Sequence, residues 1–257
     1  MELGLQDKVA IITGGSQGIG KATALRLAAE GAAVVIAARG AERLAEVEQA
    51  IRAAGGKALA VPQDISTEAG CAALIEAAVS AFGRLDILIN NAGTSATGAF
   101  ESVADATWQA DFDLKLFAAI RLSRLAIPHM KRQGGGRIIN LTAIAAKQPR
   151  AGSMPTSVTR AAGLALTKAL SKELAPENIL VNTVCIGLVR AGQHEARAAR
   201  TGTDLEALYA NMAKDIPLGR VGEAEEAANV ITFLASSAAS FVTGTSINID
   251  GGASAVL

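Results

Sequence analysis

Residues 9–20 read Val-Ala-Ile-Ile-Thr-Gly-Gly-Ser-Gln-Gly-Ile-Gly. The apolar start is typical of a buried strand, and the glycines stand where that strand would turn into a helix. Gly14 permits the turn, Gly18 allows the backbone to approach a pyrophosphate, and Gly20 allows the helix to pack on the sheet. The first N–H groups of such a helix are unpaired and attract phosphate. The stretch therefore predicts a strand, a loop and a helix that bind a dinucleotide, with a purely structural turn as the alternative.

Short apolar runs and alanine-rich helical patterns alternate along the whole chain. Runs this apolar are typical of strands buried on both faces, and the helical stretches supply the crossovers that parallel pairing requires. No linker divides the chain, so we expect one domain over residues 1–257. The predicted fold class is α/β, a doubly wound parallel sheet of the Rossmann type with about seven strands and helices on both faces. The predicted strands are Val9–Thr13, Ala33–Ala38, Ala58–Val61, Asp86–Asn90, Arg137–Leu141, Ile179–Val184 and Ser246–Ile249.

Composition excludes several classes of protein. Lys and Arg number 24 and so do Asp and Glu, which leaves no net charge to favour a nucleic-acid surface. The apolar stretches are too short to span a membrane, and the first residues lack the layout of a signal peptide. Cys71 and Cys185 have no metal-ligand spacing, so we predict two buried thiols and no metal site. We expect a cytoplasmic protein.

Several motifs in chain order resemble one family. The glycine pattern is followed by Asp64 after the third predicted strand, by Asn90-Asn91-Ala92-Gly93 after the fourth, and by Asp250-Gly251-Gly252 near the end. The ordered set resembles the short-chain dehydrogenase/reductase family over essentially the whole chain, and is most similar to members of the 3-oxoacyl-carrier-protein-reductase type. The resemblance implies an NAD(P)(H)-binding oxidoreductase that acts on a small carbonyl or alcohol substrate.

The resemblance also implies which residues hold the cofactor. Asp64 would meet the adenine, Asn90 would neighbour the adenosine ribose, and Gly93 would line the nicotinamide end. The alternatives are that Asp64 is a helix cap near Ser66 and that Asn90 only forms a turn. The full set of implied cofactor-binding residues is Thr13, Gly14, Ser16, Gln17, Gly18, Ile19, Gly20, Arg39, Asp64, Ile65, Asn90, Ala92, Gly93, Arg160, Gly187 and Val189.

The end of the second predicted strand favours NADP(H) over NAD(H). A carboxylate at this place would bind a free ribose 2′-hydroxyl, whereas an arginine can pair with a 2′-phosphate. This chain reads Ala37-Ala38-Arg39 and has no carboxylate there. Gln17 stands where the glycine loop often carries a supporting basic residue. Arg39 could instead be an ordinary solvated residue.

The reactive residues of the family are replaced in this chain. Its Asn, Ser, Tyr and Lys positions fall on Lys115, Ala143, Thr156 and Arg160. The one tyrosine, Tyr209, is not followed by a lysine four residues later. A threonine hydroxyl is a far weaker acid than a phenol beside a lysine, so hydride transfer by the ordinary route should be slow.

Other groups near these positions leave alternatives open. Thr142 and Tyr209 are the substitutes we considered for the missing acid, with His194 and Glu195 close to Tyr209 in sequence. Lys115 and Arg160, with Lys147 after Ala143, could form a site for an anionic substrate. Lys115 could instead pair with Asp111, which stands four residues earlier on the same helix.

Three functions therefore stay open: an oxidoreductase with a rearranged site, a catalytically inactive dinucleotide-binding sensor or scaffold, and a non-redox reaction that uses Arg160. The irregular stretch 190–215 could be a substrate lid or a plain insertion. By the resemblance, the helices predicted over Asp105–Arg132 and Pro155–Leu174 pair across a two-fold axis. This pairing would make a homo-oligomer, either a dimer or a tetramer.

Overall fold

The computed structural model describes residues 2–257, apart from the side chains of residues 193–197. Its main feature is a parallel seven-stranded sheet with the strand order β3-β2-β1-β4-β6-β8-β9. The order reverses between β1 and β4, which is the topological switch point where such sheets bind ligands. The strands are β1 (Val9–Thr13), β2 (Ala33–Ala38), β3 (Lys57–Pro62), β4 (Ile87–Asn90), β6 (Gly136–Ala143), β8 (Ile179–Ile186) and β9 (Ser246–Ile249).

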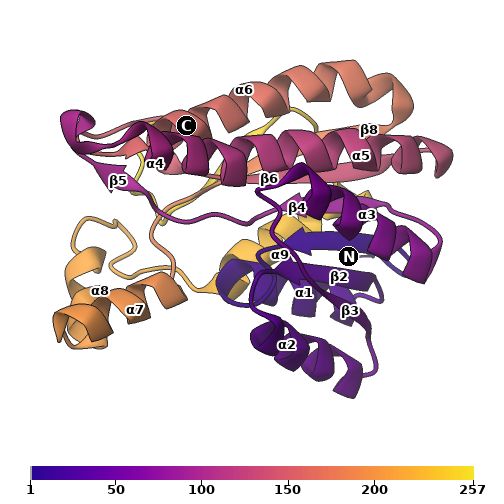
Figure 1. The fold of residues 1–257 in the computed structure, drawn as a ribbon, viewed down its shortest axis with the longest axis horizontal. Coiled ribbons are helices and arrows are strands. Elements are labelled where there is room, and N and C mark those ends of the chain that lie inside the picture. The colour runs from indigo at the N-terminus through magenta and orange to yellow at the C-terminus, as the bar shows by residue number, and fades with distance from the viewer. Residues whose placement is uncertain (1) are drawn as a thin grey trace.

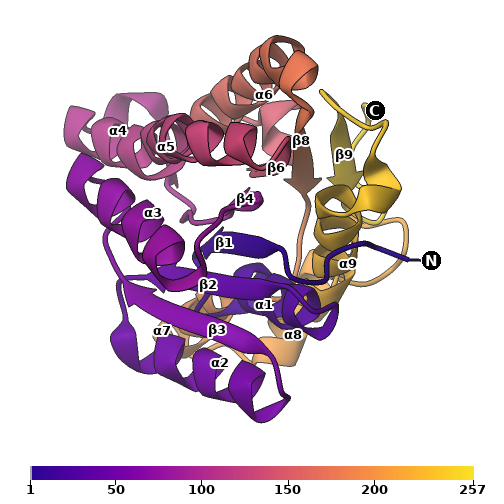
Figure 2. The ribbon, with the colours of Figure 1, turned by 90° about the vertical axis from the view of Figure 1, so that its right-hand side faces the viewer.

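Helices cover both faces of this sheet, as Figures 1 and 2 show. One face carries α1, α2 and α9, and the other carries α3, α5 and α6. Two further helices, α7 and α8, lie away from the sheet (Figure 1). The helices are α1 (Gly18–Ala29), α2 (Ala41–Ala53), α3 (Glu68–Phe82), α4 (Asp105–Phe112), α5 (Ala118–Arg132), α6 (Thr156–Leu174), α7 (Gly192–Thr201), α8 (Leu205–Ala213) and α9 (Ala224–Ala235).

Burial on both faces explains why the strands lack polar alternation. Along β1, Ile11 packs with α3 and α5 while Ile12 packs with α1 and α9, and both side chains are fully buried. Each is hydrogen-bonded in register with β2, Ile11 opposite Val35 and Ile12 opposite Ile36. Fully burying an aliphatic side chain contributes about 1.5–3 kcal/mol, so these two layers are the main source of stability. The predicted α/β sheet with helices on both faces is confirmed.

Two local features differ from the sequence-based prediction. The helix predicted over Asp105–Arg132 is interrupted by a π-helical turn, Asp113–Phe117, between α4 and α5. A short antiparallel ribbon, which we did not predict, pairs β5 (Thr97–Gly98) with β7 (Met154–Pro155). Both features lie beside the candidate site and shape it. No helix in the described part of the chain has the length and apolar character needed to cross a membrane.

Candidate active site

The residues predicted to form the site come together at one edge of the sheet. The strands are parallel, so their carboxyl ends meet there, and most of the predicted residues stand at or just after one of these ends. They lie at the end of β1 and after it (Thr13–Gly20), after β2 (Arg39), after β3 (Asp64 and Ile65), at the end of β4 and just after it (Asn90–Gly93), at the end of β6 (Ala143) and after β8 (Gly187 and Val189). Lys115, Thr156 and Arg160 come instead from the π-helical turn and the first turns of α6.

The glycine loop has the shape that a pyrophosphate requires. Gly14 and Gly18 have φ angles of +66° and +53°, a backbone region that other residues rarely adopt. A Cβ at Gly20 would lie 2.2 Å from the Gly14 carbonyl oxygen, so only glycine lets α1 begin this close to the loop. No described atom beyond its chain neighbours lies within 4 Å of a Cβ position at Gly18, and no described side chain caps the start of α1. This open helix N-terminus fits an anionic phosphate group.

Thr13 ties this loop to the loop after β4. Its hydroxyl donates to the Ile89 carbonyl and accepts from the backbone N–H groups of Asn91 and Ala92, each at 3.0 Å. The Asn91 amide also donates to the Thr13 carbonyl at 2.8 Å. Asn91 was not among the predicted site residues, and the Asn90-Asn91-Ala92-Gly93 motif was the signal that could have identified it. Thr13 and Asn91 hold the two loops together at the switch point.

Two predicted cofactor contacts have structural roles of their own. An Asp64 carboxylate oxygen accepts from the Ser66 hydroxyl at 2.8 Å and from its N–H at 3.0 Å. These bonds, with a smaller contribution from the charge of Arg39, lower the pKa of Asp64. Asn90 is buried and donates to the Asn140 amide oxygen at 2.8 Å. Asp64 thus forms a turn with Ser66, whereas the helix cap of α3 is Thr67 and not Asp64. Its contact with an adenine stays a prediction.

A second arginine stands beside Arg39. Arg39 is exposed after β2, and Arg43 extends from the first turn of α2 to donate to the Gln17 amide oxygen at 2.8 Å. Neither arginine forms an ion pair in the described part of the chain. Arg43 was missed from the sequence because nothing there shows that α2 begins next to the glycine loop.

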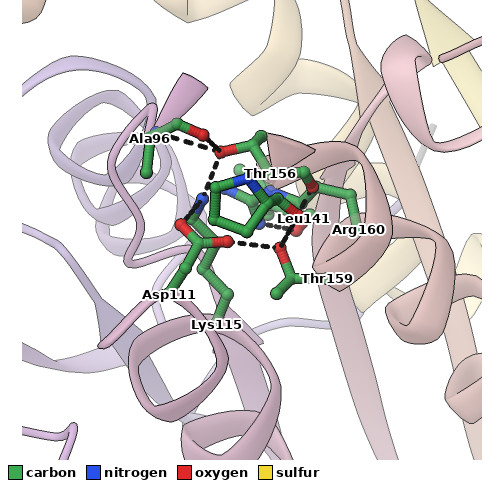
Figure 3. A network of polar contacts seen from close by, with 8 residues as sticks. Ala96, Asp111, Lys115, Leu141, Thr156, Thr159 and Arg160 are labelled. Atoms are coloured by element: carbon green, nitrogen blue, oxygen red, sulfur yellow. Dashed lines mark hydrogen bonds and ion pairs between the residues drawn. The ribbon is translucent and has the colours of Figure 1, made fainter. Parts of the chain in front are cut away.

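Three of the positions that the resemblance implied for the reactive residues, Lys115, Thr156 and Arg160, lie in a polar network, shown in Figure 3. Lys115 lies in the π-helical turn, and its ammonium donates to the Asp111 carboxylate and, at 2.8 Å, to the Thr156 hydroxyl. The Thr156 hydroxyl in turn donates to the Ala96 carbonyl at 2.8 Å and accepts from the Ala96 N–H at 3.0 Å. A hydroxyl has one proton and two lone pairs. All three are used here.

The Asp111–Lys115 pair is almost completely removed from solvent. Each side chain is 1% exposed, and the second Asp111 oxygen accepts from the Thr159 hydroxyl at 2.6 Å. Burial, followed by the charge of Arg160, lowers the pKa of Lys115 from 10.5 to about 8, although Asp111 opposes the shift. The alternative that Lys115 pairs with Asp111 is therefore the arrangement in the structure. Lys115 is unavailable as a free cation for a substrate.

The depressed pKa of Lys115 predicts a pH effect on stability. Between pH 8 and 10.5 the unfolded chain holds a proton on this lysine that the folded chain has lost. This group alone should therefore make the free energy of unfolding rise with pH, by up to about 1.4 kcal/mol per pH unit. Burial raises the pKa of Cys71 from 9.0 to about 11, which opposes the trend above pH 9. Urea unfolding measured between pH 8 and pH 9 should show a rise in the free energy of unfolding for the native chain and no such rise for Lys115→Met. Equal slopes of this free energy against pH in the two proteins would contradict the prediction.

Arg160 is the remaining cation of the site. One of its terminal nitrogens donates to the Leu141 carbonyl. The other would lie only 2.5 Å from a Cβ at position 93, so the glycine at this position leaves room for the guanidinium. Burial lowers its pKa to about 10, which keeps it charged at neutral pH. Its Nε and the Asn90 amide oxygen are buried without a partner among the described atoms. Both residues line a cavity of about 10 Å³, close to the size of one water molecule.

The candidate substitutes for the missing acid are engaged elsewhere. The Thr142 hydroxyl points to β8, 3.1 Å from the Cys185 sulfur. Tyr209 is 3% exposed and packs with Ile216 and Val221, with the Arg190 guanidinium 4.3 Å from its ring centre. Both side chains thus have contacts of their own in the structure, and a role for either as the acid stays a prediction.

Lys147 does not join the cations near Gly93. Its ammonium donates to the Ser246 carbonyl at 3.0 Å and to the Asn248 amide oxygen at 2.7 Å, both on β9. Of the three cations considered for an anionic substrate, Lys147 is bound to β9 and Lys115 is paired with Asp111, which leaves Arg160 as the candidate.

Stretch 190–215 contains α7 and α8. Arg190 anchors it through ion pairs with Glu206 at 2.8 Å and Glu223 at 3.1 Å. A Cβ at Gly192 would lie 3.0 Å from the Gln17 amide oxygen, so the start of α7 contacts the glycine loop. The side chains of His194 and Glu195 lie outside the described residues. This contact places stretch 190–215 beside the loop, and its action as a lid stays a prediction.

Comparison with known proteins identifies the family. A family model described as enoyl-(acyl carrier protein) reductase matches residues 14–254. The chain belongs to the short-chain dehydrogenase/reductase family. It is 36% identical to the short-chain reductase protein NovJ of Streptomyces niveus, over 96% of this chain and 94% of that protein. It is 34% identical to the 3-oxoacyl-[acyl-carrier-protein] reductase FabG of Aquifex aeolicus, over 98% and 99%.

Solved structures of the family agree with the fold. L-sorbose reductase from Gluconobacter frateurii, determined with NADPH and L-sorbose, superposes with a TM-score of 0.95 at 36% identity and covers all of both chains. The family predicted from the motifs is thus confirmed, and this chain is an oxidoreductase of the short-chain type. Among the described residues, no three or more His, Cys, Asp or Glu side chains are grouped so that they could hold a metal ion.

Proposed function

We propose that this short-chain oxidoreductase binds NADP(H) at the glycine loop and reduces ordinary ketones only very slowly. The observation that carries the proposal is the Thr156 hydroxyl, whose proton and two lone pairs are all engaged by Ala96 and Lys115. The open start of α1 and the exposed pair Arg39 and Arg43 support the binding half of the proposal.

NADPH, when bound, supplies a hydride to a substrate carbon, and the carbonyl oxygen must then receive a proton. Thr156 is an aliphatic alcohol whose proton is already donated to a backbone carbonyl. Loss of a positioned proton donor typically costs about a hundred- to ten-thousand-fold in rate. Ala143 has no hydroxyl to stabilise the developing negative charge, and loss of one such donor costs about a hundredfold or more. The two losses together make turnover slow even with the cofactor in place.

Arg160 defines the kind of substrate that suits the site. Its guanidinium lies against Gly93, where the nicotinamide end of the cofactor is expected, and its charge is not matched by a carboxylate in direct contact in the described part of the chain. A planar guanidinium binds carboxylate and phosphate groups in two-pronged fashion. We therefore propose an anionic substrate, such as a keto acid or an acyl phosphopantetheine.

The cofactor preference can be tested with two arginine variants. We expect NADPH to bind at least about tenfold more tightly than NADH, because charge-assisted bonds to the 2′-phosphate contribute about 1.5–3 kcal/mol. Arg39→Gln and Arg43→Gln should each remove most of this preference and leave NADH affinity unchanged, as measured by titration of nicotinamide fluorescence. Arg26→Gln, at the far end of α1, is the matched control. Equal affinities for the two cofactors, with no effect of either variant, would disprove the preference.

A non-catalytic NADP(H)-binding protein is the second candidate function. The fully engaged Thr156 hydroxyl favours it, because the proton of this hydroxyl is already donated to the Ala96 carbonyl. Turnover separates the two candidates: a slow but saturable reduction of a keto acid supports the enzyme, and tight NADPH binding without any oxidation supports the sensor or scaffold.

We also propose a homo-oligomer and a cytoplasmic location, both drawn from the family. Phe117 at the start of α5 is 39% exposed and Val158 on α6 is 41% exposed, so the predicted contact helices present apolar surface. Phe241, close to the edge strand β9, is fully exposed. These side chains support burial against other copies of the chain.

A further inference from the structure

A second cavity lies at the opposite edge of the sheet, where the strands begin. Its volume is about 190 Å³, and its walls include Lys8, Asp86 and Asn178, which come directly before β1, β4 and β8. The turn Gly134–Gly136, between α5 and β6, and Ser236 at the end of α9 complete it. We call it the basal cavity. Figure 1 shows the end of α5 on the other side of the molecule from α7 and α8, so this cavity is separate from the candidate active site.

Arg137 is the unusual residue of the basal cavity. One terminal nitrogen donates to the carbonyls of Gly136 at 2.9 Å and Asn178 at 3.5 Å. Its Nε is buried and has no partner, and no carboxylate pairs with the guanidinium in the part of the chain that the structure describes. Burial lowers its pKa, and no neighbouring acid counteracts that effect. A half-buried cation without a counter-ion is costly, so an anion at this place would stabilise the protein.

The one carboxylate of the basal cavity cannot serve as this counter-ion. The Asp86 side chain is 6% exposed and receives two bonds from Arg84, at 2.7 and 2.8 Å, and one from the Val9 N–H at 2.9 Å. The Lys8 ammonium also lies 3.6 Å from an Asp86 carboxylate oxygen, and the Lys8 side chain is 41% exposed. The charged residues that line the cavity are thus two cations, Lys8 and Arg137, and the single carboxylate of Asp86, which is already paired with Arg84, so the lining carries net positive charge.

We propose that the basal cavity binds a small oxyanion, a phosphate or carboxylate group, between Arg137 and Lys8. The volume suits a compact ligand and is well below the 300 Å³ or more of typical cofactor and drug sites. Arg137 would offer its free terminal nitrogen as the directed donor, and Lys8 would act as a mobile point charge at the rim. The proposal does not depend on NADP(H) binding, because the two sites lie at opposite edges of the sheet.

The test is a thermal-unfolding titration of the full chain with inorganic phosphate, and in parallel with succinate, at constant ionic strength in potassium chloride. The native chain should show a saturable rise in Tm with at least one anion, and the stronger response identifies the ligand group. Gln133→Glu adds a negative charge at the exposed rim of the basal cavity, which repels an anion, and should weaken anion binding at least tenfold. Arg137→Gln should abolish it. Gln49→Glu, an exposed site on α2 with the same change of charge, is the matched control and should bind as the native chain does.

A second pair of variants excludes the glycine loop as the source of the response, since that loop is also expected to attract phosphate. Arg39→Gln with Arg43→Gln should leave the anion response of the basal cavity intact. The proposal is overturned if this double variant loses the response, if Gln133→Glu keeps it, or if no saturable rise occurs. Gln133→Glu keeps the test decisive even if Arg137→Gln fails to fold, because Gln133 is exposed.

Discussion

The combined substitution Lys115→Asn, Ala143→Ser, Thr156→Tyr and Arg160→Lys is expected to raise the rate of ketone-dependent NADPH oxidation at least about a hundredfold. It supplies a phenol whose pKa a neighbouring lysine can lower, and a hydroxyl that can hold the developing oxyanion. In the native chain neither group is present, and the Thr156 hydroxyl is engaged by Ala96. The loss of NADPH absorbance over a panel of ketones and keto acids measures the effect.

The matched control is the same four-fold variant with Thr156→Phe in place of Thr156→Tyr. It adds the same ring without the hydroxyl and should stay as slow as the native chain. Lys115→Asn leaves the buried Asp111 without its partner, so Asp111→Asn is added to both variants to keep them folded. If the native chain already matches the rate of the tyrosine variant, the site has a proton donor that we have not recognised.

Asp111→Asn alone should lower the free energy of unfolding by about 3–5 kcal/mol, the usual cost of removing one partner of a buried ion pair. Both side chains of the Asp111–Lys115 pair are 1% exposed, so the lysine left behind has no access to water. The Thr159 hydroxyl loses a charged acceptor at the same time. Urea unfolding at neutral pH, followed by circular dichroism, measures the change.

Two further variants show whether burial is the cause. Asp111→Asn combined with Lys115→Met removes both charges and should regain most of the lost stability, because a buried pair often contributes little over an apolar replacement. Glu30→Gln breaks the Arg26–Glu30 pair, in which the arginine is 50% exposed, and should cost less than about 1 kcal/mol. A similarly small cost for Asp111→Asn would show that water reaches Lys115.

The sheet could be predicted because its signal is local. Each strand is a short apolar run, and helical patterns alternate with these runs along the chain, so the order of patterns was enough to indicate a parallel α/β fold. The glycine loop carried equally local information, since Gly14 and Gly18 adopt φ angles that few other residues tolerate. Strand ends were off by one or two residues, as for β6, which runs on to Ala143.

The inside of the site could not be predicted, because its contacts join distant parts of the chain. Thr156 meets Lys115 across 41 residues and Ala96 across 60, and no sequence pattern specifies such pairings. The π-helical turn that carries Lys115 leaves no trace in the apolar periodicity. The burial of Tyr209 under Arg190 likewise depends on how α8 packs, which the sequence does not specify.

We propose that this chain binds NADPH in a site that lacks the usual proton donor, and one experiment tests both the binding and the lack of a donor. The native protein is titrated with NADPH while nicotinamide fluorescence is recorded, and a keto acid is then added to the saturated complex. We expect saturable binding, followed by a signal that decays at least about a hundredfold more slowly than in the rebuilt tyrosine variant. Absence of binding, or rapid decay in the native protein, would contradict it.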